Sequence, residues 1–185
     1  MKEFTIIDAD LYRYKDELSS FSKLRAFLIP GFRYTYFLRK SASFKKKSIA
    51  GIFFRLLLLM HSYFYGFQIT PSTKIGKGLY IGHRGTIIVN SKAIIGECCN
   101  LSPGVTIGQT NRGTKKGAPV IGNKVWIGTN AVIVGQITIG NNVLIAPNAY
   151  INMDIPNNSI VIGNPGKIIS KDNPTADYIV SCYEN

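Results

Sequence analysis

The sequence is poor in the residues that build metal sites and disulfide frameworks. The 185-residue chain contains three cysteines, of which Cys98 and Cys99 are adjacent, and two histidines, His61 and His83. No Cys-x-x-Cys pair is present, so we expect no metal site built from protein ligands. The cysteines do not form the pattern of a disulfide framework, and they fit free thiols in a reducing cytoplasm.

Long apolar runs are also missing. The longest, Ile52 to Met60, is interrupted by Arg55 and is far shorter than the roughly 18 residues of a spanning helix. The first thirty residues carry acidic side chains and no apolar signal core, which argues against secretion. We therefore expect a cytoplasmic protein, with a peripheral position at the inner face of the membrane as the alternative.

Acidic residues are few, since 10 Asp and Glu stand against 22 Lys and Arg, for a formal net charge of +12. Such a charge suits acidic ligands, which include phosphates, anionic lipid and nucleic acid. A basic surface without a specific ligand is an equally good interpretation. Because no nucleic-acid-binding motif is recognised, we expect no nucleic-acid partner.

What the sequence does contain is a ladder of aliphatic residues with a six-residue step. A period of six is neither helical nor that of a simple strand, and it is typical of parallel β-helices, in which each repeat is a short strand plus a corner. The pattern predicts a mainly β fold, a parallel β-helix with these residues stacked inside: Ile69, Ile75, Ile81, Val89, Ile95, Leu101, Ile107, Ile121, Ile127, Ile133, Ile139, Ile145 and Ile151.

The ladder is interrupted twice. The spacing is eight residues between Ile81 and Val89, and fourteen between Ile107 and Ile121. The second segment, residues 108–119, has no inward aliphatics and is rich in hydrogen-bonding and cationic groups, so it should leave the coil as a loop. Insertions in a solenoid often lie on the binding face. The glycines of this loop do not fit the phosphate-loop pattern.

The regions on either side of the ladder differ from it. Residues 1–66 contain little Gly and many apolar residues, and we predict a helical N-terminal region with one helix within 11–28 and others at 32–40 and 48–65. The β-helix domain is predicted over 67–169, with a last strand at 159–162. The polar tail, 170–185, is predicted to be less ordered, with a short helix at 177–183.

A basic cluster, residues 45–47, precedes the apolar and aromatic segment up to residue 67. Residues 45–67 could lie on an anionic membrane surface, with the cations at the head groups. Alternatively, the apolar face packs on the β-helix or on a neighbouring subunit and the lysines are solvated. We favour the second interpretation because a short helical appendage must bury one face.

His83 stands out by its position, directly after Ile81 and Gly82 and at the start of the first interruption. A histidine there should point away from the core of a rigid scaffold. Imidazole titrates near neutral pH and suits proton removal from a hydroxyl. A plain surface histidine is the alternative on these observations alone.

Three motifs carry a family resemblance. They are Gly-His-Arg-Gly-Thr-Ile-Ile-Val at 82–89, Gly-Val-Thr-Ile-Gly at 104–108 and Gly-Asn-Pro-Gly-Lys at 163–167. With the ladder, they resemble the hexapeptide-repeat acyltransferases over residues 66–169. The closest branch is that of the serine acetyltransferase-like proteins, which includes polysaccharide O-acetyltransferases. The resemblance implies a left-handed β-helix, a homotrimer with active sites between subunits, acetyl-CoA as the donor, and His83 as the general base.

The chain departs from serine acetyltransferases around the acceptor. The aspartate that orients the family histidine is replaced by Gln68, the acid before the histidine by Gly82, and a second histidine with its arginine by Pro103 and Ser102. We therefore predict a carbohydrate hydroxyl as the acceptor, with Gln68, Arg84 and Ser102 as pocket candidates. A serine O-acetyltransferase with an altered pocket and a non-catalytic module that binds a membrane or a partner are the alternatives.

The resemblance places CoA in a cleft along the later coils. Thr129 and Pro147 are eighteen residues apart, which predicts that they stack one coil from each other. Trp126 could flank the adenine or pack at a coil corner. Lysines in this region could bind the CoA phosphates or be solvated charges without a ligand. The predicted CoA-binding residues are Gly108, Lys115, Lys116, Thr129, Pro147 and Lys167.

Overall fold

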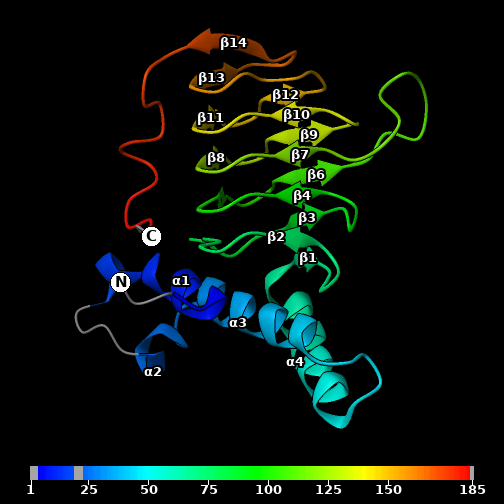
Figure 1. Ribbon diagram of the computed structural model, residues 1–185, viewed down its shortest axis with the longest axis vertical. Helices are drawn as coiled ribbons and strands as arrows, with labels where there is room; N and C mark the ends of the chain where they lie inside the picture. Colours follow the sequence, from blue (N-terminus) through cyan, green and yellow to red (C-terminus); the bar gives the residue numbers. More distant parts are fainter. Residues whose placement is uncertain (1–3, 19–22, 184–185) are drawn as a thin grey trace.

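A computed structural model describes residues 4–18 and 23–183 and shows a three-sided parallel β-solenoid of about five turns standing on a base of helices (Figure 1). Sheet A consists of β1 (Phe67–Ile69), β3 (Ile87–Val89), β6 (Thr106–Gly108), β9 (Val132–Val134) and β12 (Tyr150–Ile151). Sheet B consists of β2 (Lys74–Ile75), β4 (Ile94–Ile95), β7 (Val120–Ile121) and β10 (Thr138–Ile139). Sheet C consists of β5 (Asn100–Leu101), β8 (Val125–Ile127), β11 (Val143–Ile145), β13 (Ser159–Ile162) and β14 (Lys167–Ser170).

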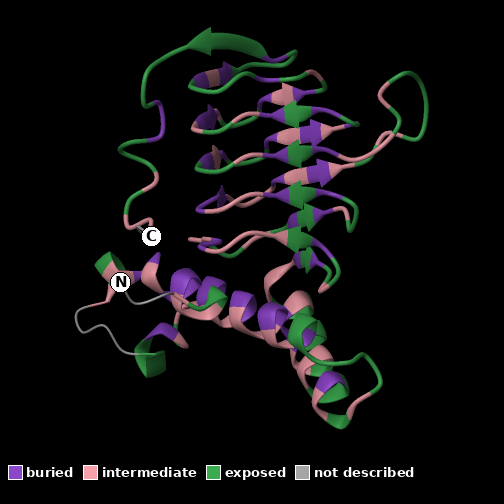
Figure 2. Cartoon of the chain, viewed as in Figure 1, coloured by how far each residue is buried: buried purple, intermediate pink, exposed green. Residues whose placement is uncertain are grey.

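The aliphatic ladder forms the core of the solenoid. In sheet A, Val89 pairs with Ile69 and Ile107, and Ile133 pairs with Ile107 and Ile151, all in parallel register. All the ladder residues are buried except Ile75, which is partly buried and packs on the others. Figure 2 shows the resulting line of buried positions along the strands. The structure confirms the predicted mainly β fold with a helical N-terminal region.

The loop between β6 and β7 projects from the side of the solenoid (Figure 1). Its base is a pair of backbone hydrogen bonds between Thr110 and Gly117, with N–O distances of 2.9 and 3.0 Å. The loop is also joined to the next coil, because the Gln136 amide donates to the carbonyl of Lys115 at 2.9 Å. The fourteen-residue interruption therefore consists of one side of a coil and an inserted, hydrogen-bonded loop.

The N-terminal region forms α1 (Ile6–Tyr12), a 3-10 turn (Lys15–Glu17), α2 (Lys23–Ala26), α3 (Pro30–Ser43) and α4 (Ile49–Tyr65). The Ser48 side chain caps the start of α4, and Gly66 ends it in the left-handed conformation at φ 77°, as helix termini commonly do. The single helix predicted within 11–28 is wrong. Leu11 is buried whereas Leu24 and Leu28 are exposed, so the apolar positions do not share one face; Phe21 lies outside the described residues.

Charged side chains of α1 and α3 close the edge of the first coil. The Arg39 guanidinium contacts the Asp10 carboxylate at 2.8 Å and donates to the carbonyls of Ile75 and Gly76 at 2.7 and 2.6 Å. Asp10 in turn accepts from the amides of Gly78 and Leu79, both at 2.9 Å. A terminal coil has no neighbour to satisfy its backbone groups, and this buried ion pair satisfies four of them.

Two tyrosines do the same for the neighbouring sides of the first coil. The Tyr14 hydroxyl accepts from the Ile81 amide at 3.0 Å and donates to the Ile81 carbonyl at 3.2 Å. The Tyr34 hydroxyl accepts from the Ile69 amide at 3.2 Å and lies 3.1 Å from the Ile69 carbonyl. The helical region is thus a cap built on the solenoid by polar side chains.

The C-terminal tail runs back along the solenoid from β14 to the helical cap (Figure 1). The prediction of a short helix at 177–183 is wrong, because the tail forms turns around 174–178 and no helix in its described part. Its path is fixed by contacts with sheet C: the Lys171 amide donates to the Asn158 carbonyl at 3.0 Å, and the Thr175 hydroxyl donates to Asn142 at 2.5 Å. The tail therefore packs on one side of the solenoid.

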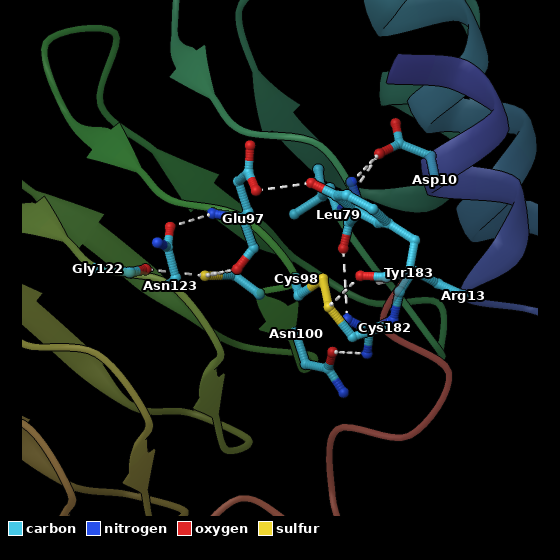
Figure 3. Close-up of a disulfide and its surroundings, with 12 residues drawn as sticks. Asp10, Arg13, Leu79, Glu97, Cys98, Asn100, Gly122, Asn123, Cys182 and Tyr183 are labelled. Carbon is cyan, nitrogen blue, oxygen red and sulfur yellow. Dashed lines mark hydrogen bonds between the residues drawn. A yellow bond between two sulfur atoms is a disulfide. The ribbon is translucent and has the colours of Figure 1, made fainter. Parts of the chain in front are cut away.

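A disulfide joins the tail to the second coil, between Cys98 and Cys182 with a Cα–Cα distance of 5.8 Å (Figure 3). The expectation of three free thiols is wrong for these two cysteines. The pair could not be recognised from the sequence, since the two cysteines are separated by 84 positions and only the return of the tail brings them together. Cys99 remains a free, buried thiol.

Candidate active site

His83 lies at the first interruption of the ladder, in the turn between sheet C and sheet A. Gly85 makes this turn possible: its φ is +141°, and a Cβ at this position would lie 2.9 Å from Cβ of Pro103. A side chain could not be accommodated there without moving the backbone. The turn leaves His83 exposed at the edge of a cavity of about 220 Å³.

The cavity runs across the outer surface of the first three coils. Its other lining residues are Tyr80, Gly82, Asn100, Leu101, Ser102, Pro103, Trp126 and Thr129. Tyr80, Asn100 and Trp126 occupy equivalent positions in successive coils, each directly before an inward ladder residue, and they pair in parallel register. The outward face of sheet C therefore supplies one wall of the cavity.

Residues that follow α1 fix the side chains of this wall. The Tyr80 hydroxyl donates to the Glu17 carboxylate at 2.6 Å, and burial raises the pKa of Tyr80 far above its ordinary value, with the Glu17 contact acting in the same direction. Arg13 donates to Oδ1 of Asn100 at 2.7 Å. The phenol thus stays neutral, and the orientations of Tyr80 and Asn100 are fixed.

The C-terminal tail forms the rim of the cavity. The Asn100 side-chain amide donates to the Tyr178 carbonyl at 3.1 Å, and the rings of Trp126 and Tyr178 lie 4.8 Å apart. Beyond Tyr178 the tail reaches the disulfide residue Cys182 and then Tyr183, whose hydroxyl donates to the Glu97 carboxylate at 2.7 Å (Figure 3). Trp126 therefore packs against the tail at the coil corner while it also lines the cavity.

The acceptor candidates are placed in different surroundings. Ser102 lines the cavity of His83. Gln68 lines a separate groove between sheet A and α4, so the structure of the single chain does not bring it to His83. The Arg84 guanidinium lies 5.6 Å from the ring centre of Tyr65, and Arg33 lies at the same distance from that ring and donates to its hydroxyl. Arg84 is thus directed to α4 rather than into the cavity.

The predicted CoA residues are spread along the coils. Thr129 lines the cavity of His83, and its carbonyl accepts from the Asn148 amide at 2.9 Å, which places the neighbouring Pro147 one coil further along. Gly108 pairs with Val134 in sheet A. The Lys115 ammonium donates to the carbonyl of Asn152 at 2.9 Å, and the side chains of Lys116 and Lys167 are exposed.

Two side chains that could serve as a base or a nucleophile, His61 and Cys99, lie outside the cavity. His61 is buried in the cap, where its Nδ1 lies 2.7 Å from the Leu57 carbonyl and its ring packs on Phe37 and Tyr65. Burial raises the pKa of the Cys99 thiol to about 12, so this sulfur is a poor nucleophile. Within residues 4–18 and 23–183, no cluster of three or more His, Cys, Asp or Glu side chains is placed to hold a metal ion.

Sequence reasoning did not identify Tyr80 and Asn100 as parts of the site. The signal was available in the ladder, because the residue before each inward position of sheet C faces outward on the same side of successive coils. Aligning residues 80, 100 and 126 in this way selects Tyr80, Asn100 and Trp126. Their support by Arg13 and Glu17 depends on contacts across more than sixty residues and has no local signal.

Comparisons with known proteins support a transferase. The family described as bacterial transferase hexapeptide (six repeats) matches residues 118–152. A serine acetyltransferase of Synechococcus elongatus is 32% identical over 83 residues, which are 45% of this chain and 34% of that protein. The chain thus spans about a third of the length of this curated relative.

Solved structures match a larger part of the chain. The serine acetyltransferase of Neisseria gonorrhoeae in complex with serine has a TM-score of 0.72 and 27% identity, over 89% of this chain and 68% of that one. The serine acetyltransferase of Brucella abortus in complex with coenzyme A has a TM-score of 0.74 and 25% identity, over 90% and 67%. These matches confirm the predicted resemblance to hexapeptide-repeat acyltransferases and to their serine acetyltransferase-like branch.

The prediction of a carbohydrate acceptor is wrong. The relative is named for serine, and the Neisseria structure was solved with serine bound. The prediction relied on the loss of residues that hold serine in the family, at Gln68 and around Ser102. Loss of those contacts does not create a sugar site, and a small cavity of about 220 Å³ better suits an amino acid than a polysaccharide.

Proposed function

We propose that this protein is a serine O-acetyltransferase that uses acetyl-CoA as the acetyl donor. The observation that carries the proposal is an exposed histidine at the edge of a small polar cavity, on a scaffold similar over 89% of the chain to a serine acetyltransferase solved with serine. The cavity holds hydroxyl, amide and imidazole groups, which can bind a small polar acceptor.

In this proposal His83 is the general base. Its imidazole takes the proton of the serine hydroxyl while the oxygen attacks the thioester carbonyl, so that a C–O bond forms. Collapse of the tetrahedral intermediate breaks the C–S bond, and the imidazolium returns the proton to the departing sulfur. The products are O-acetylserine and CoA with a free thiol. Ser102 and Thr129, which line the same cavity, are proposed to orient the acceptor.

CoA is proposed to extend beyond the cavity along the outer surface of the later coils. The cavity of about 220 Å³ is too small to enclose a whole CoA molecule, so most of the donor must lie outside it. The exposed ammonium groups of Lys116 and Lys167 have the charge that CoA phosphates require. Lys115, already bound to a carbonyl, holds the loop against the coil. We further propose that a homotrimer supplies the facing wall from a neighbouring subunit.

The test is an assay of the purified protein with acetyl-CoA and L-serine, which measures thiol release and identifies O-acetylserine by mass spectrometry. His83→Ala should lower kcat by about 10²- to 10⁴-fold, the usual contribution of a general base. Binding of CoA, measured by calorimetry, should be retained, and Lys92→Ala, at an exposed residue of another corner, should behave as wild type.

Three results would contradict the proposal. Absence of O-acetylserine at saturating serine would remove serine as the acceptor. A His83→Ala protein with near-normal turnover would remove His83 as the base. Absence of any CoA binding would favour the non-catalytic interpretation of the scaffold.

A further inference from the structure

Helix α4 carries a broad apolar face that nothing in the described chain covers. Eight large apolar side chains on it are between 43% and 90% exposed. Their spacing of three and four residues places them on neighbouring turns of one side of the helix. We call this surface the α4 outer face; it consists of Ile49, Ile52, Phe53, Leu56, Leu59, Met60, Tyr63 and Phe64.

The α4 outer face is distinct from the face that holds the helix in the fold. Leu58 and His61 on the opposite side are buried, and His61 packs on Phe37 of α3. The loop before α4 and the start of the helix lie at the base of the molecule, away from the solenoid, whereas the end of α4 leads into β1 (Figure 1). Figure 2 shows exposed positions along the loop and the helix. Apolar surface of this extent on a soluble domain usually marks an interaction site.

The charge around this face has one sign. Between Glu17 and Glu97 the sequence contains no acidic residue. Lys45, Lys46 and Lys47 are exposed in the loop that leads directly into α4. The same acid-free stretch contains these basic residues: Lys23, Arg25, Arg33, Arg39, Lys40, Lys45, Lys46, Lys47, Arg55, Lys74, Lys77, Arg84 and Lys92.

We propose that the α4 outer face docks on an anionic lipid bilayer, with the helix lying in the plane of the interface. A cationic segment beside an exposed apolar helical face is the arrangement of interfacial helices. In this orientation the apolar side chains enter the acyl boundary and residues 45–47 contact the lipid phosphates. No described helix is long and apolar enough to cross a membrane, and α4 has 17 residues, or about 25 Å of length.

The charge pattern favours lipid over a second copy of the chain. A parallel two-fold contact between two α4 outer faces would bring two basic segments together, and like charges at an interface are unfavourable. An antiparallel contact would place each basic segment beside the other end of α4, where the sequence has no acidic residue to pair with it. Lysine is also depleted in protein–protein interfaces. Anionic head groups, by contrast, neutralise residues 45–47 directly.

Docking by this face would bring the active-site turn close to the membrane. The Gly85 amide donates to the carbonyl of Tyr65, the last residue of α4, at 3.3 Å, and Arg84 stacks on the Tyr65 ring. The first coil therefore holds His83 next to the C-terminal end of the docking helix. The docking proposal does not depend on the identity of the acetyl acceptor.

The test is flotation of the full-length protein with vesicles of phosphatidylcholine alone or with added phosphatidylserine. Wild type should float with the anionic vesicles, and less so at high salt. The substitution Lys45→Gln, Lys46→Gln and Lys47→Gln should weaken this binding roughly 100-fold, from the usual contribution of a lysine near an anionic surface. Phe53→Ser with Leu56→Ser should also reduce it, through lost apolar insertion.

A matched control at the other end of the solenoid combines Ile169→Ser with Lys171→Gln, both exposed, and should float as wild type. The lysine substitutions touch only an exposed loop, so folding is retained in at least that protein. Equal flotation of wild type and both α4 variants, or none of wild type with anionic vesicles, would overturn the proposal. A changed oligomeric state of the Phe53 and Leu56 variant by light scattering without lipid would assign the face to a second copy instead.

Discussion

At the N-terminal end of the solenoid, side chains from α1 and α3 satisfy the backbone of the first coil, whereas at the C-terminal end the chain covers its last coil with its own next strand. The first arrangement buries an ion pair between Asp10 and Arg39. The second is the antiparallel pair of β13 and β14, and every residue of β14 is exposed. One end depends on long-range polar contacts and the other on a local hairpin.

The difference matters for function because the His83 cavity lies at the polar end. Tyr14 bonds to Ile81, two residues before His83, and Arg13 bonds to Asn100 in the cavity wall. The tail then connects the two ends: it leaves β14, passes the cavity rim at Tyr178 and is joined to the second coil by the disulfide. Damage at the polar end should therefore affect both stability and the site.

Removal of the Arg39 guanidinium at the N-terminal end of the solenoid should cause the largest loss of stability. Arg39→Ala leaves the buried Asp10 without its ion-pair partner and two backbone carbonyls without a donor, and loss of one partner of a buried pair costs about 3–5 kcal/mol. Urea unfolding should show this loss. Lys74→Ala, at an exposed basic residue of β2, is the matched control and should stay within about 0.5 kcal/mol of wild type.

A loss below about 1 kcal/mol for Arg39→Ala, within the range of ordinary surface pairs, would show that the cap is not held by this ion pair. Substitutions at the two ends of the solenoid would then cost similar free energies of unfolding, although the ends are closed by different contacts.

Much of the solenoid could be predicted from the sequence, because each inward residue lies six positions from the next and this periodicity is local. The strand at Ser159–Ile162 and the start of α4 after Ser48 also follow from local patterns. Asp10 and Cys182 could not be assigned, because their partners lie 29 to 84 residues away. The site divides in the same way: His83 follows from an interruption of the ladder, whereas Tyr80 and Asn100 acquire their roles from contacts with the cap.

Removal of the disulfide that joins the tail to the second coil should have the next largest effect on stability. Cys98→Ser removes a disulfide that closes a loop of 84 residues, and such bonds typically contribute about 2–4 kcal/mol. Unfolding of wild type should therefore shift on addition of dithiothreitol, whereas the variant should not respond. Cys182→Ser is the matched variant and should show the same loss. A wild type whose unfolding is unchanged by the reductant would indicate that the tail is held by its other contacts alone.

A smaller effect is expected when one hydroxyl is removed from the polar end. Tyr14→Phe keeps the buried ring but leaves the amide and carbonyl of Ile81 without their partner, at a cost of about 1–3 kcal/mol. Because Ile81 leads into the His83 turn, turnover with acetyl-CoA and serine should fall as well. Tyr63→Phe, at a tyrosine that is 83% exposed, is the control. Unchanged stability and turnover in Tyr14→Phe would show that the cap does not support the site.

The smallest effect on stability should come from the C-terminal end of the solenoid, which is closed by the β13–β14 hairpin. Ile169→Ser changes a residue of β14 that is 46% exposed and leaves its backbone pairing with Ile160 of β13 intact. Because the strand is held by backbone hydrogen bonds and nearly half of the side-chain surface stays in water on folding, the free energy of unfolding should change by less than about 1 kcal/mol. A loss of more than about 1 kcal/mol would mean that the side chains of β14 carry part of the closure, as those of the helical cap do at the other end.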